Sequence, residues 1–154
     1  MSGSIKLNPP KEVAIENELV LPADFRMTKQ RREVYEVLMQ HRSHPTASEV
    51  FMFAKEHMPT ISLATVYNCL ETLTHAGLVK QVNFDREPSR YCPNLAEHGH
   101  FHCTDCGEVA DIEFKHGCKA RELTKLPKGT IVEQLDIAIK GTCPACSKKR
   151  QNNN

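Results

Sequence analysis

The sequence predicts an α+β fold, in which an N-terminal winged helix-turn-helix domain precedes a small α/β dimerisation domain with a four-cysteine zinc site. Three observations lead to this prediction. Apolar residues recur at helical spacing in three successive segments of the first half. A strand, a turn and a second strand follow them. The second half then carries two Cys-x-x-Cys pairs between segments that alternate like strands.

Three helices are expected before residue 78, and each has its own start or stop signal. Thr28 is a suitable N-cap for a first helix that ends near Gln40, and the capping box Thr46-Ala-Ser-Glu49 begins a second. Ser62 would cap a third helix, which stops at Gly77. The apolar side chains expected in the core are Val34, Val37 and Leu38 of the first helix, Val50, Phe51 and Ala54 of the second, and Val66, Leu70 and Leu73 of the third.

A hairpin and a tail complete the first half. Leu78–Phe84 has the pattern of a strand, residues 85–89 that of a turn, and a return strand begins at Arg90. The prolines near the N-terminus indicate a tail with a short helix over 11–19. The expected division is a tail over 1–24, the winged helix over 25–92, the dimerisation and metal-binding domain over 93–147, and a polar tail over 148–154.

The second half is expected to be an α/β module built around one cysteine turn. Strands over 98–103 and 109–114 flank this turn, a helix follows at about 116–126, and the alternation of 131–139 predicts a last strand. A module of this size buries little apolar surface alone. A zinc ion and dimerisation would both compensate for the small core.

The composition is that of an ordinary soluble protein, with 154 residues, 40% hydrophobic and 25% charged. No apolar run is long enough to span a bilayer and no secretory signal is visible, so we expect a cytoplasmic location. In a reducing cytosol the seven cysteines would act as thiols and metal ligands rather than as disulfides. The net charge of +1 excludes a strongly basic coat protein but is compatible with DNA binding through a local basic face.

The strongest motif is a set of four cysteines, made of Cys103, Cys106, Cys143 and Cys146. Each Cys-x-x-Cys pair can supply two ligands to one ion, and two pairs complete the tetrahedral set that structural zinc favours. A redox pair is the alternative, because Cys143-Pro-Ala-Cys146 resembles a thioredoxin-like motif. That chemistry needs a helix to begin at the motif, and the basic residues 148–150 and the polar end indicate no such helix.

A second group of metal-binding side chains lies just upstream. Three histidines alternate along a predicted strand and would project to one side, namely His98, His100 and His102. Imidazoles spaced in this way can share one ion. Cys92 ends the hairpin, Asp111 lies on the neighbouring strand, and His44 could reach the same ion from the start of the second helix. His44 could equally be a helix-start residue that simply precedes Pro45.

Five motifs in a fixed order give the chain a resemblance to a known family. They are Arg26-Met-Thr28-Lys-Gln30-Arg31, His44-Pro-Thr-Ala47, Leu63-Ala-Thr-Val-Tyr67-Asn-Cys-Leu70, His98-Gly-His100 and Cys103-Thr-Asp-Cys106-Gly107. Through them, residues from about 25 to 146 resemble the ferric uptake regulator family of bacterial metal-dependent repressors. The resemblance implies a homodimer that binds palindromic, AT-rich operators in double-stranded DNA when a regulatory metal is loaded. We therefore expect no enzymatic activity.

Position by position, the resemblance places the regulatory ligands at His44, Cys92, His98, His100 and Asp111, and the structural zinc at the four cysteines. His102 has no counterpart in the family pattern. A thiolate at Cys92, where iron and peroxide sensors have a carboxylate, favours zinc, whereas His44 is typical of the iron and peroxide branches. The second metal is therefore Zn²⁺, Fe²⁺ or Mn²⁺. A further interdomain site would fall on a poor ligand set, which includes Glu97, Gly99 and Cys118.

Candidate DNA contacts lie on the first and third helices. The basic side chains that suit phosphates are Arg26, Lys29 and Arg31, although they could also be a solvated helix start. Basic residues near Arg26 enter the minor groove in the family. The exposed face of the third helix offers Thr65, Tyr67 and Asn68. Asn68 stands where the family commonly has an arginine, so it would pair with adenine rather than with guanine.

Alternative functions stay open at this point. A peroxide-sensing regulator would use metal-catalysed oxidation of its histidine ligands, or oxidation of Cys92. A zinc or thiol enzyme would need an open zinc position and a general base, for which Glu97 is the obvious neighbour. A zinc-ribbon interaction module would not need the histidine cluster. Cys69 is expected in the core, and Cys118 has no assigned role.

Overall fold

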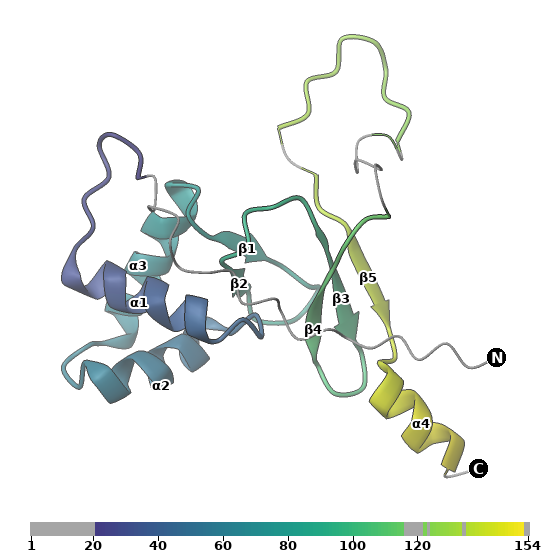
Figure 1. Ribbon diagram of the computed structural model, residues 1–154, viewed down its shortest axis with the longest axis horizontal. Helices are drawn as coiled ribbons and strands as arrows, with labels where there is room; N and C mark the ends of the chain where they lie inside the picture. The colour runs from purple at the N-terminus through teal and green to yellow at the C-terminus, as the bar shows by residue number, and fades with distance from the viewer. Residues whose placement is uncertain (1–20, 116–121, 123, 134, 153–154) are drawn as a thin grey trace.

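In the computed structural model, the residues described are 21–115, 122, 124–133 and 135–152 (Figure 1). The helix expected over 11–19 lies outside these residues, and so does most of the helix expected over 116–126. The described residues 124–126 are not helical. Within the described ranges, no helix is long and apolar enough to cross a membrane.

Three helices form the first part of the molecule, as the sequence predicts, and they are α1 Lys29–Gln40, α2 Ala47–His57 and α3 Leu63–His75. Their apolar stripes meet in one core, in which Phe51 is only partly buried. Side chains such as Val50, Leu70 and Leu73 are fully enclosed. Burial of an apolar side chain of this size contributes about 1.5–3 kcal/mol, so this core stabilises the helical part strongly.

Local capping signals begin the helices where the sequence predicts. The hydroxyls of Thr28 and Ser62 accept main-chain hydrogen bonds at the starts of α1 and α3, at 3.3 and 3.1 Å. Thr46 and Glu49 form the expected capping box of α2. Each cap satisfies a main-chain N–H that the helix leaves unpaired. The loop that carries His44 ends at this cap.

The hairpin consists of β1 Lys80–Val82 and β2 Arg90–Cys92, which pair antiparallel. Tyr91 joins the helical core, and its N–H donates to the Pro45 carbonyl at 3.0 Å. An isolated bridge between Thr46 and the first residue of β2 adds a second attachment. The hairpin is thus fastened to the loop between α1 and α2.

A three-stranded sheet forms the second part, from the strands β3 Gly99–Cys103, β4 Val109–Ile112 and β5 Ala138–Gly141. The central strand β3 pairs antiparallel with β4 and parallel with β5. The register places His100 opposite Asp111. Cys103 ends the same strand, and the alternation of side chains puts His100 and Cys103 on opposite faces. One strand therefore carries a candidate ligand of each predicted metal site.

Two elements of the C-terminal part differ from what the sequence predicts. Among the described residues of the strand expected over 131–139, only those from Ala138 are in a strand, and Ile131 is 87% exposed. Alternation shows which side chains share a face, but it does not supply a neighbouring strand to pair with. The polar tail expected over 148–154 is helical as far as it is described, because α4 spans Pro144–Asn152. Proline at the first helical position favours this start.

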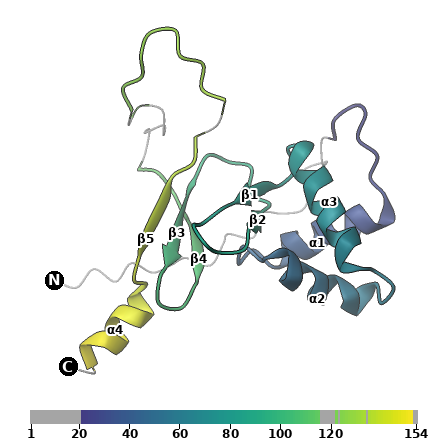
Figure 2. The same cartoon turned by 180° about the vertical axis from the view of Figure 1, so that it is seen from behind.

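The hairpin lies between the three helices and the three-stranded sheet in both views of the molecule (Figures 1 and 2). A second buried cluster joins it to the sheet part, from Val82, Phe84 and Cys92 to Val109 of β4. In both views α4 lies at the far end of the sheet from the helices. The hairpin is therefore the structural link between the two parts.

Candidate metal centres and nucleic-acid interface

The four cysteines lie together where β3 ends and α4 begins. Cys103 ends β3, Cys106 follows in the next turn, and Cys143 and Cys146 lie at the start of α4. Their sulfur atoms all lie within 4.8 Å of one another. The Cys143 N–H donates to Cys103 Sγ at 3.2 Å, and the Cys146 N–H donates to Cys143 Sγ at 3.5 Å. Main-chain donors aimed at sulfur stabilise thiolates, which are the form that binds metal.

The thiols of this set affect one another's ionisation. The N–H groups of Cys143 and Cys106 lower the pKa of Cys103 to about 6. The neighbouring Cys143 thiol raises the pKa of Cys146 to about 12. Four crowded thiols cannot all ionise unless a cation offsets their charge. Four soft donors grouped in this way fit a tetrahedral zinc ion.

A redox pair at the start of α4 is disfavoured by the arrangement of the cysteines, not by the lack of a helix. Cys143-Pro-Ala-Cys146 does open a helix, contrary to the expectation from sequence. The redox reading is instead disfavoured by the neighbouring cysteines, because Cys106 Sγ lies 3.9 Å from Cys143 Sγ. A dithiol pair has no need of two further cysteines at this range, whereas a tetrahedral zinc site requires them.

The second group combines side chains from three parts of the chain, namely His44, Cys92, His98, His100 and Asp111. One possible ligand atom of each lies within 4.8 Å of all the others, so the structure brings together all five predicted regulatory ligands. His44 comes from the loop before α2 and Cys92 from the end of β2. The other three lie on or beside β3 and β4. Both His44, at 3% exposed, and Cys92, at 1%, are buried.

Nitrogen, sulfur and oxygen atoms of this mixed group converge at short range. Asp111 Oδ1 lies 2.7 Å from His44 Nε2 and 3.3 Å from His98 Nε2. His98 Nε2 also lies 3.1 Å from His100 Nε2 and 3.5 Å from Cys92 Sγ. Neither ring nitrogen of the buried His44 is in hydrogen-bond geometry, including the one beside Asp111. An orphaned buried imidazole among other donors fits a metal ligand.

The charges of the mixed group are set by its own members. Burial lowers the pKa of His44, but the adjacent Asp111 and Cys92 outweigh it and raise that pKa to about 9. Burial raises the pKa of Cys92, but His100, His44 and His98 together lower it to about 5. Burial opposes ionisation of Asp111 too, yet His44 and His98 hold its pKa well below the usual range. Without a metal, the thiolate and the carboxylate are therefore ionised at neutral pH, and a bound cation would displace the proton that they hold on His44.

Two residues that the sequence did not single out orient these ligands. Asn94 Nδ2 donates to Asp111 Oδ2 at 2.9 Å, and His98 Nδ1 lies 2.7 Å from the Ala96 carbonyl. An Nδ1–H given to a carbonyl leaves the Nε2 lone pair free for a metal. Both contacts arise from the fold of the loop between β2 and β3. No residue-type pattern in the sequence could have indicated them.

His102 lies apart from the mixed group. Its Nε2 lies 3.1 Å from Glu87 Oε2, and its ring stacks on Phe84 with 4.6 Å between centroids. Alternation places it on the same face of β3 as His100, but further along the strand, where the hairpin covers it. His102 therefore packs the hairpin against the sheet.

The further interdomain site, which the sequence disfavours, gains no support. Among the described residues, Glu97 belongs to neither ligand group. Gly99 offers no side chain, and a β-carbon there would approach the Ile137 carbonyl to 3.0 Å. Cys118 lies outside the described residues.

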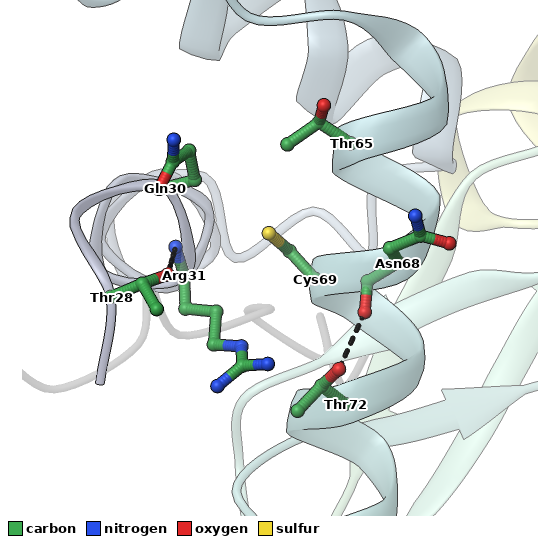
Figure 3. A pocket seen from close by; sticks show the side chains of 7 residues that line it. All are labelled: Thr28, Gln30, Arg31, Thr65, Asn68, Cys69 and Thr72. Carbon is green, nitrogen blue, oxygen red and sulfur yellow. Dashed lines mark hydrogen bonds between the residues drawn. The ribbon is translucent and has the colours of Figure 1, made fainter. Parts of the chain in front are cut away.

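A pocket of about 170 Å³ lies between α1 and α3 (Figure 3), and it is lined by Thr28, Gln30, Arg31, Thr65, Asn68, Cys69 and Thr72. Three predicted DNA contacts, Arg31, Thr65 and Asn68, thus surround one hollow. Cys69 is 5% exposed and belongs to the core as expected, and its sulfur points from α3 toward α1. Gln30 also lines this pocket, although the sequence did not place it among the expected DNA contacts because it carries no charge.

The other predicted DNA contacts lie close to this pocket. Tyr67 is 50% exposed on α3, and Arg26 and Lys29 are exposed at the start of α1. Arg31 Nη1 donates to the Arg26 carbonyl at 2.6 Å, which connects the two arginines. The two helices therefore offer polar and basic side chains to solvent on either side of the pocket.

The sequence is also similar to those of known proteins. The profile of the Ferric uptake regulator family matches residues 22–139. The chain belongs to the ferric uptake regulator family. The peroxide operon regulator of Bacillus subtilis (strain 168) is 32% identical over 135 residues, which are 88% of this chain and 93% of that relative. The peroxide-responsive repressor PerR of Staphylococcus aureus (strain Mu50) is 30% identical over 127 residues, which are 82% and 86% of the two chains.

Solved structures of two bacterial regulators are similar to this chain in fold. The Campylobacter jejuni peroxide stress regulator has a TM-score of 0.61 at 32% identity, and the match covers 76% of this chain and 88% of that one. The ferric uptake regulator from Francisella tularensis with iron has a TM-score of 0.65 over 83% and 98% of the chains. Its identity is 23%, so it supports the fold alone. The predicted α+β fold is thus confirmed as that of the family.

Proposed function

We propose that this protein is a metal-responsive, DNA-binding transcription repressor that acts as a homodimer and controls metal homeostasis. The observation that carries this proposal is the mixed ligand group. His44 belongs to the helical part, Cys92 to the hairpin, and the other ligands to the sheet part. The five side chains can share one ion only while the three parts keep this arrangement.

Regulation follows from this geometry through linkage. An arrangement in which all five side chains reach the ion binds it more tightly than one in which His44 has moved away. Metal loading therefore favours the closed arrangement by the difference in affinity between the two. By the same linkage, DNA that prefers the closed arrangement tightens metal binding by an equal factor.

We assign DNA binding to residues 25–92, acting as a winged helix-turn-helix. In this proposal α3 enters the major groove and directs Tyr67 and Asn68 toward base edges. An asparagine pairs with adenine through two hydrogen bonds, which agrees with an AT-rich operator. Arg26 and Lys29 at the start of α1 would contact phosphates and fix the register on the duplex.

A homodimer is supported by exposed apolar side chains in the sheet part. Ile131, Leu135 and Ile139 are 87%, 38% and 51% exposed. In the described sheet, β5 is an edge strand with no neighbour on its outer side. Apolar surface and an open edge are usually covered in a stable protein. We therefore assign dimerisation to residues 93–147, and a two-fold dimer would place two α3 helices on the half-sites of a palindrome.

We assign a structural zinc to the four cysteines and a second divalent ion to the mixed group. Imidazole and carboxylate ligands accommodate Zn²⁺, Fe²⁺ or Mn²⁺, whereas the Cys92 thiolate favours zinc. A zinc-responsive repressor is therefore the first expectation from the chemistry of the donors.

A peroxide-responsive repressor is the second candidate. Relatives that are 30–32% identical to this chain carry the names peroxide operon regulator and peroxide-responsive repressor. In that case peroxide would oxidise a histidine ligand beside bound iron, or Cys92 itself, and the damaged site would lose its ion. DNA would then be released because the closed arrangement is no longer favoured.

The experiment is a DNA-binding titration with the four-cysteine zinc retained. The anisotropy of a labelled fragment from the gene's own promoter is followed against buffered free Zn²⁺, and then against Fe²⁺ and Mn²⁺ without oxygen. Tight binding at very low free zinc identifies a zinc-responsive repressor. Binding that needs Fe²⁺ or Mn²⁺ and collapses after peroxide identifies the peroxide sensor. DNA affinity that none of the three metals changes overturns the proposal.

A further inference from the structure

Arg90 contacts both loops that carry the two predicted metal sites. It is the first residue of β2, two positions before Cys92, and its side chain is 19% exposed. Its Nη1 donates to the His44 carbonyl at 3.1 Å. Its Nη2 donates to the Gly107 carbonyl at 3.4 Å. One planar guanidinium therefore joins the loop of a regulatory ligand to the turn of the zinc site.

The first contact holds a strained residue. His44 has a backbone φ of 57°, in the left-handed region that a residue with a β-carbon rarely adopts. Such a conformation persists only where surrounding contacts impose it. The Arg90 contact lies on the carbonyl of His44 itself. The Tyr91 N–H to Pro45 bond and the bridge to Thr46 hold the next residues.

This backbone conformation decides where the His44 imidazole points. The ring enters the mixed group, with Nε2 2.7 Å from Asp111 Oδ1, and its edge meets the His100 ring at 5.0 Å between centroids. If His44 relaxed to an ordinary right-handed or extended backbone, its side chain would leave that direction. The Arg90 contact therefore acts on the one regulatory ligand that comes from the helical part.

The second contact ends on the turn of the four cysteines. Gly107 directly follows Cys106, and its N–H donates to the Cys103 carbonyl at 2.9 Å. Its φ is 74°, so the carbonyl direction is set by the closed turn. If one ion binds both Cys103 and Cys106, the turn between them is rigid and the Gly107 carbonyl has a fixed position. Arg90 is thereby supported from the zinc side as well as from the helical side.

We propose that Arg90 is a positioning residue for the regulatory metal, and that the turn of the four cysteines supports it from the other side. It contacts none of the metal-facing atoms of either ligand group, and it acts by holding the His44 backbone while it is itself held by the Gly107 carbonyl. This inference rests on the proposed function, because it takes the mixed group to be a metal site. A residue that merely packed the two parts together would affect all five ligands alike, whereas this one acts through His44.

The test uses full-length protein with its four-cysteine zinc in place, titrated with Co²⁺ alone. Cobalt reports its ligands by absorption, since a thiolate gives a charge-transfer band and the ligand-field bands depend on coordination number. The variants are Arg90→Gln, His44→Ala and the double variant. Arg42→Gln is the matched control, because Arg42 lies in the same loop as His44 and its Nε donates to the carbonyl of Met39 in α1, which belongs to neither ligand group.

We expect Arg90→Gln to weaken Co²⁺ binding by about 10–100-fold, the usual cost of losing a contact that orients a ligand. Its ligand-field spectrum should shift toward that of His44→Ala, while the Cys92 charge-transfer band stays. In the His44→Ala background the same change should weaken binding no further. Arg42→Gln should behave as the wild type, and all variants should keep their zinc.

The opposite results are equally clear. The proposal is overturned if Arg90→Gln weakens Co²⁺ binding equally in the wild-type and His44→Ala backgrounds. It is also overturned if Arg90→Gln weakens Co²⁺ binding but leaves the ligand-field spectrum unchanged. If Arg90→Gln fails to fold, Arg90→Lys replaces it, because lysine reaches one carbonyl but not both and should give a smaller loss in the same direction. Arg90→Gln could weaken Co²⁺ binding through His44 as expected, while Co²⁺ loading leaves DNA affinity unchanged. That result would overturn the proposed function but not this inference. If His44→Ala binds Co²⁺ as tightly as the wild type, both this inference and the proposed function are overturned.

Discussion

The two ligand groups of this molecule differ in where their side chains come from. The four cysteines belong to the sheet part alone, at the end of β3, in the following turn and at the start of α4. The mixed group instead draws on the helical part, the hairpin and the sheet part. A site built within one part stabilises that part, whereas a site built across parts can report on their arrangement. The same kind of ion would thus serve folding in one place and regulation in the other.

The two groups also differ in the chemical type of their donor atoms. Four like thiolates saturate a tetrahedral ion, and such closed sites are structural. Imidazole, thiolate and carboxylate donors together suit several ions and exchange them more readily. The following predictions test whether the two groups have these separate functions.

The largest effect is expected from Cys103→Ser, which removes a ligand of the four-cysteine group. The variant should lose its zinc and the folded sheet part, because a structural zinc contributes on the order of 10–16 kcal/mol to a small domain. Metal analysis and circular dichroism check this result. Cys69→Ala is the control and should keep its zinc. A Cys103→Ser protein that stays folded would show that the group is not structural.

A smaller but still large effect is expected from Cys92→Ser in the mixed group. Loss of a direct ligand should weaken the regulatory metal by more than the roughly 10–100-fold typical of an outer contact. Metal-dependent DNA binding should disappear, while the folded protein and its four-cysteine zinc remain. Anisotropy and metal analysis on one sample measure both. An unchanged metal response would remove Cys92 from the regulatory set.

Cys92→Asp sharpens the same comparison, because it keeps a ligand and changes only its softness. A carboxylate is a harder donor, so the preference should move from Zn²⁺ toward Fe²⁺ and Mn²⁺. The measurement is the ratio of the free Zn²⁺ and Mn²⁺ concentrations at half-maximal DNA binding. A ratio equal to that of the wild type would mean that the sulfur does not select the metal.

Asn94→Ala should have a moderate effect restricted to the mixed group. It removes the 2.9 Å hydrogen bond to Asp111 Oδ2 without touching a metal-facing atom. We expect the regulatory metal to bind about 10-fold more weakly and the zinc content to stay unchanged. Competition with a chelator of known affinity measures the shift. A loss of zinc as well would indicate that the two groups are not independent.

The smallest effect is expected from Thr46→Ala, which removes the N-cap of α2. The free energy of unfolding should fall by about 1 kcal/mol, and neither metal stoichiometry should change. Urea denaturation followed by circular dichroism measures it. If the free energy of binding of the regulatory metal also changed by more than about 1 kcal/mol, the cap would have to hold the His44 loop as well.

Local signals allowed the helical part to be predicted well. Thr28, Thr46 and Ser62 mark the three helix starts, because a hydroxyl before an apolar stripe has a direct physical function there. The last strand was predicted too long, because alternation cannot show where a pairing partner ends. Helix α4 was missed, because the polar residues after Cys146 outweighed the start signal of Pro144.

The candidate site was predictable only where residue type alone indicates chemistry. Alternation placed His98 and His100 together, but it could not separate them from His102, which lies further along the strand under the hairpin. Asn94 and Arg90 act through the fold of the chain around the ligands. Neither residue type is distinctive, so their contacts emerge only from the structure.

Strand β3 fixes the number of residues between His100 and Cys103 as strictly as it fixes their types. It holds His100 for one ligand group and Cys103 for the other, on opposite faces of the central strand. A one-residue insertion or deletion between them would turn every later side chain to the other face. A substitution at Phe101 keeps the number of residues between His100 and Cys103. A single-codon insertion or deletion changes that number, so the two residues can no longer both reach their ligand groups. Gene variants with such length changes should therefore keep at most one of the two ligand groups intact.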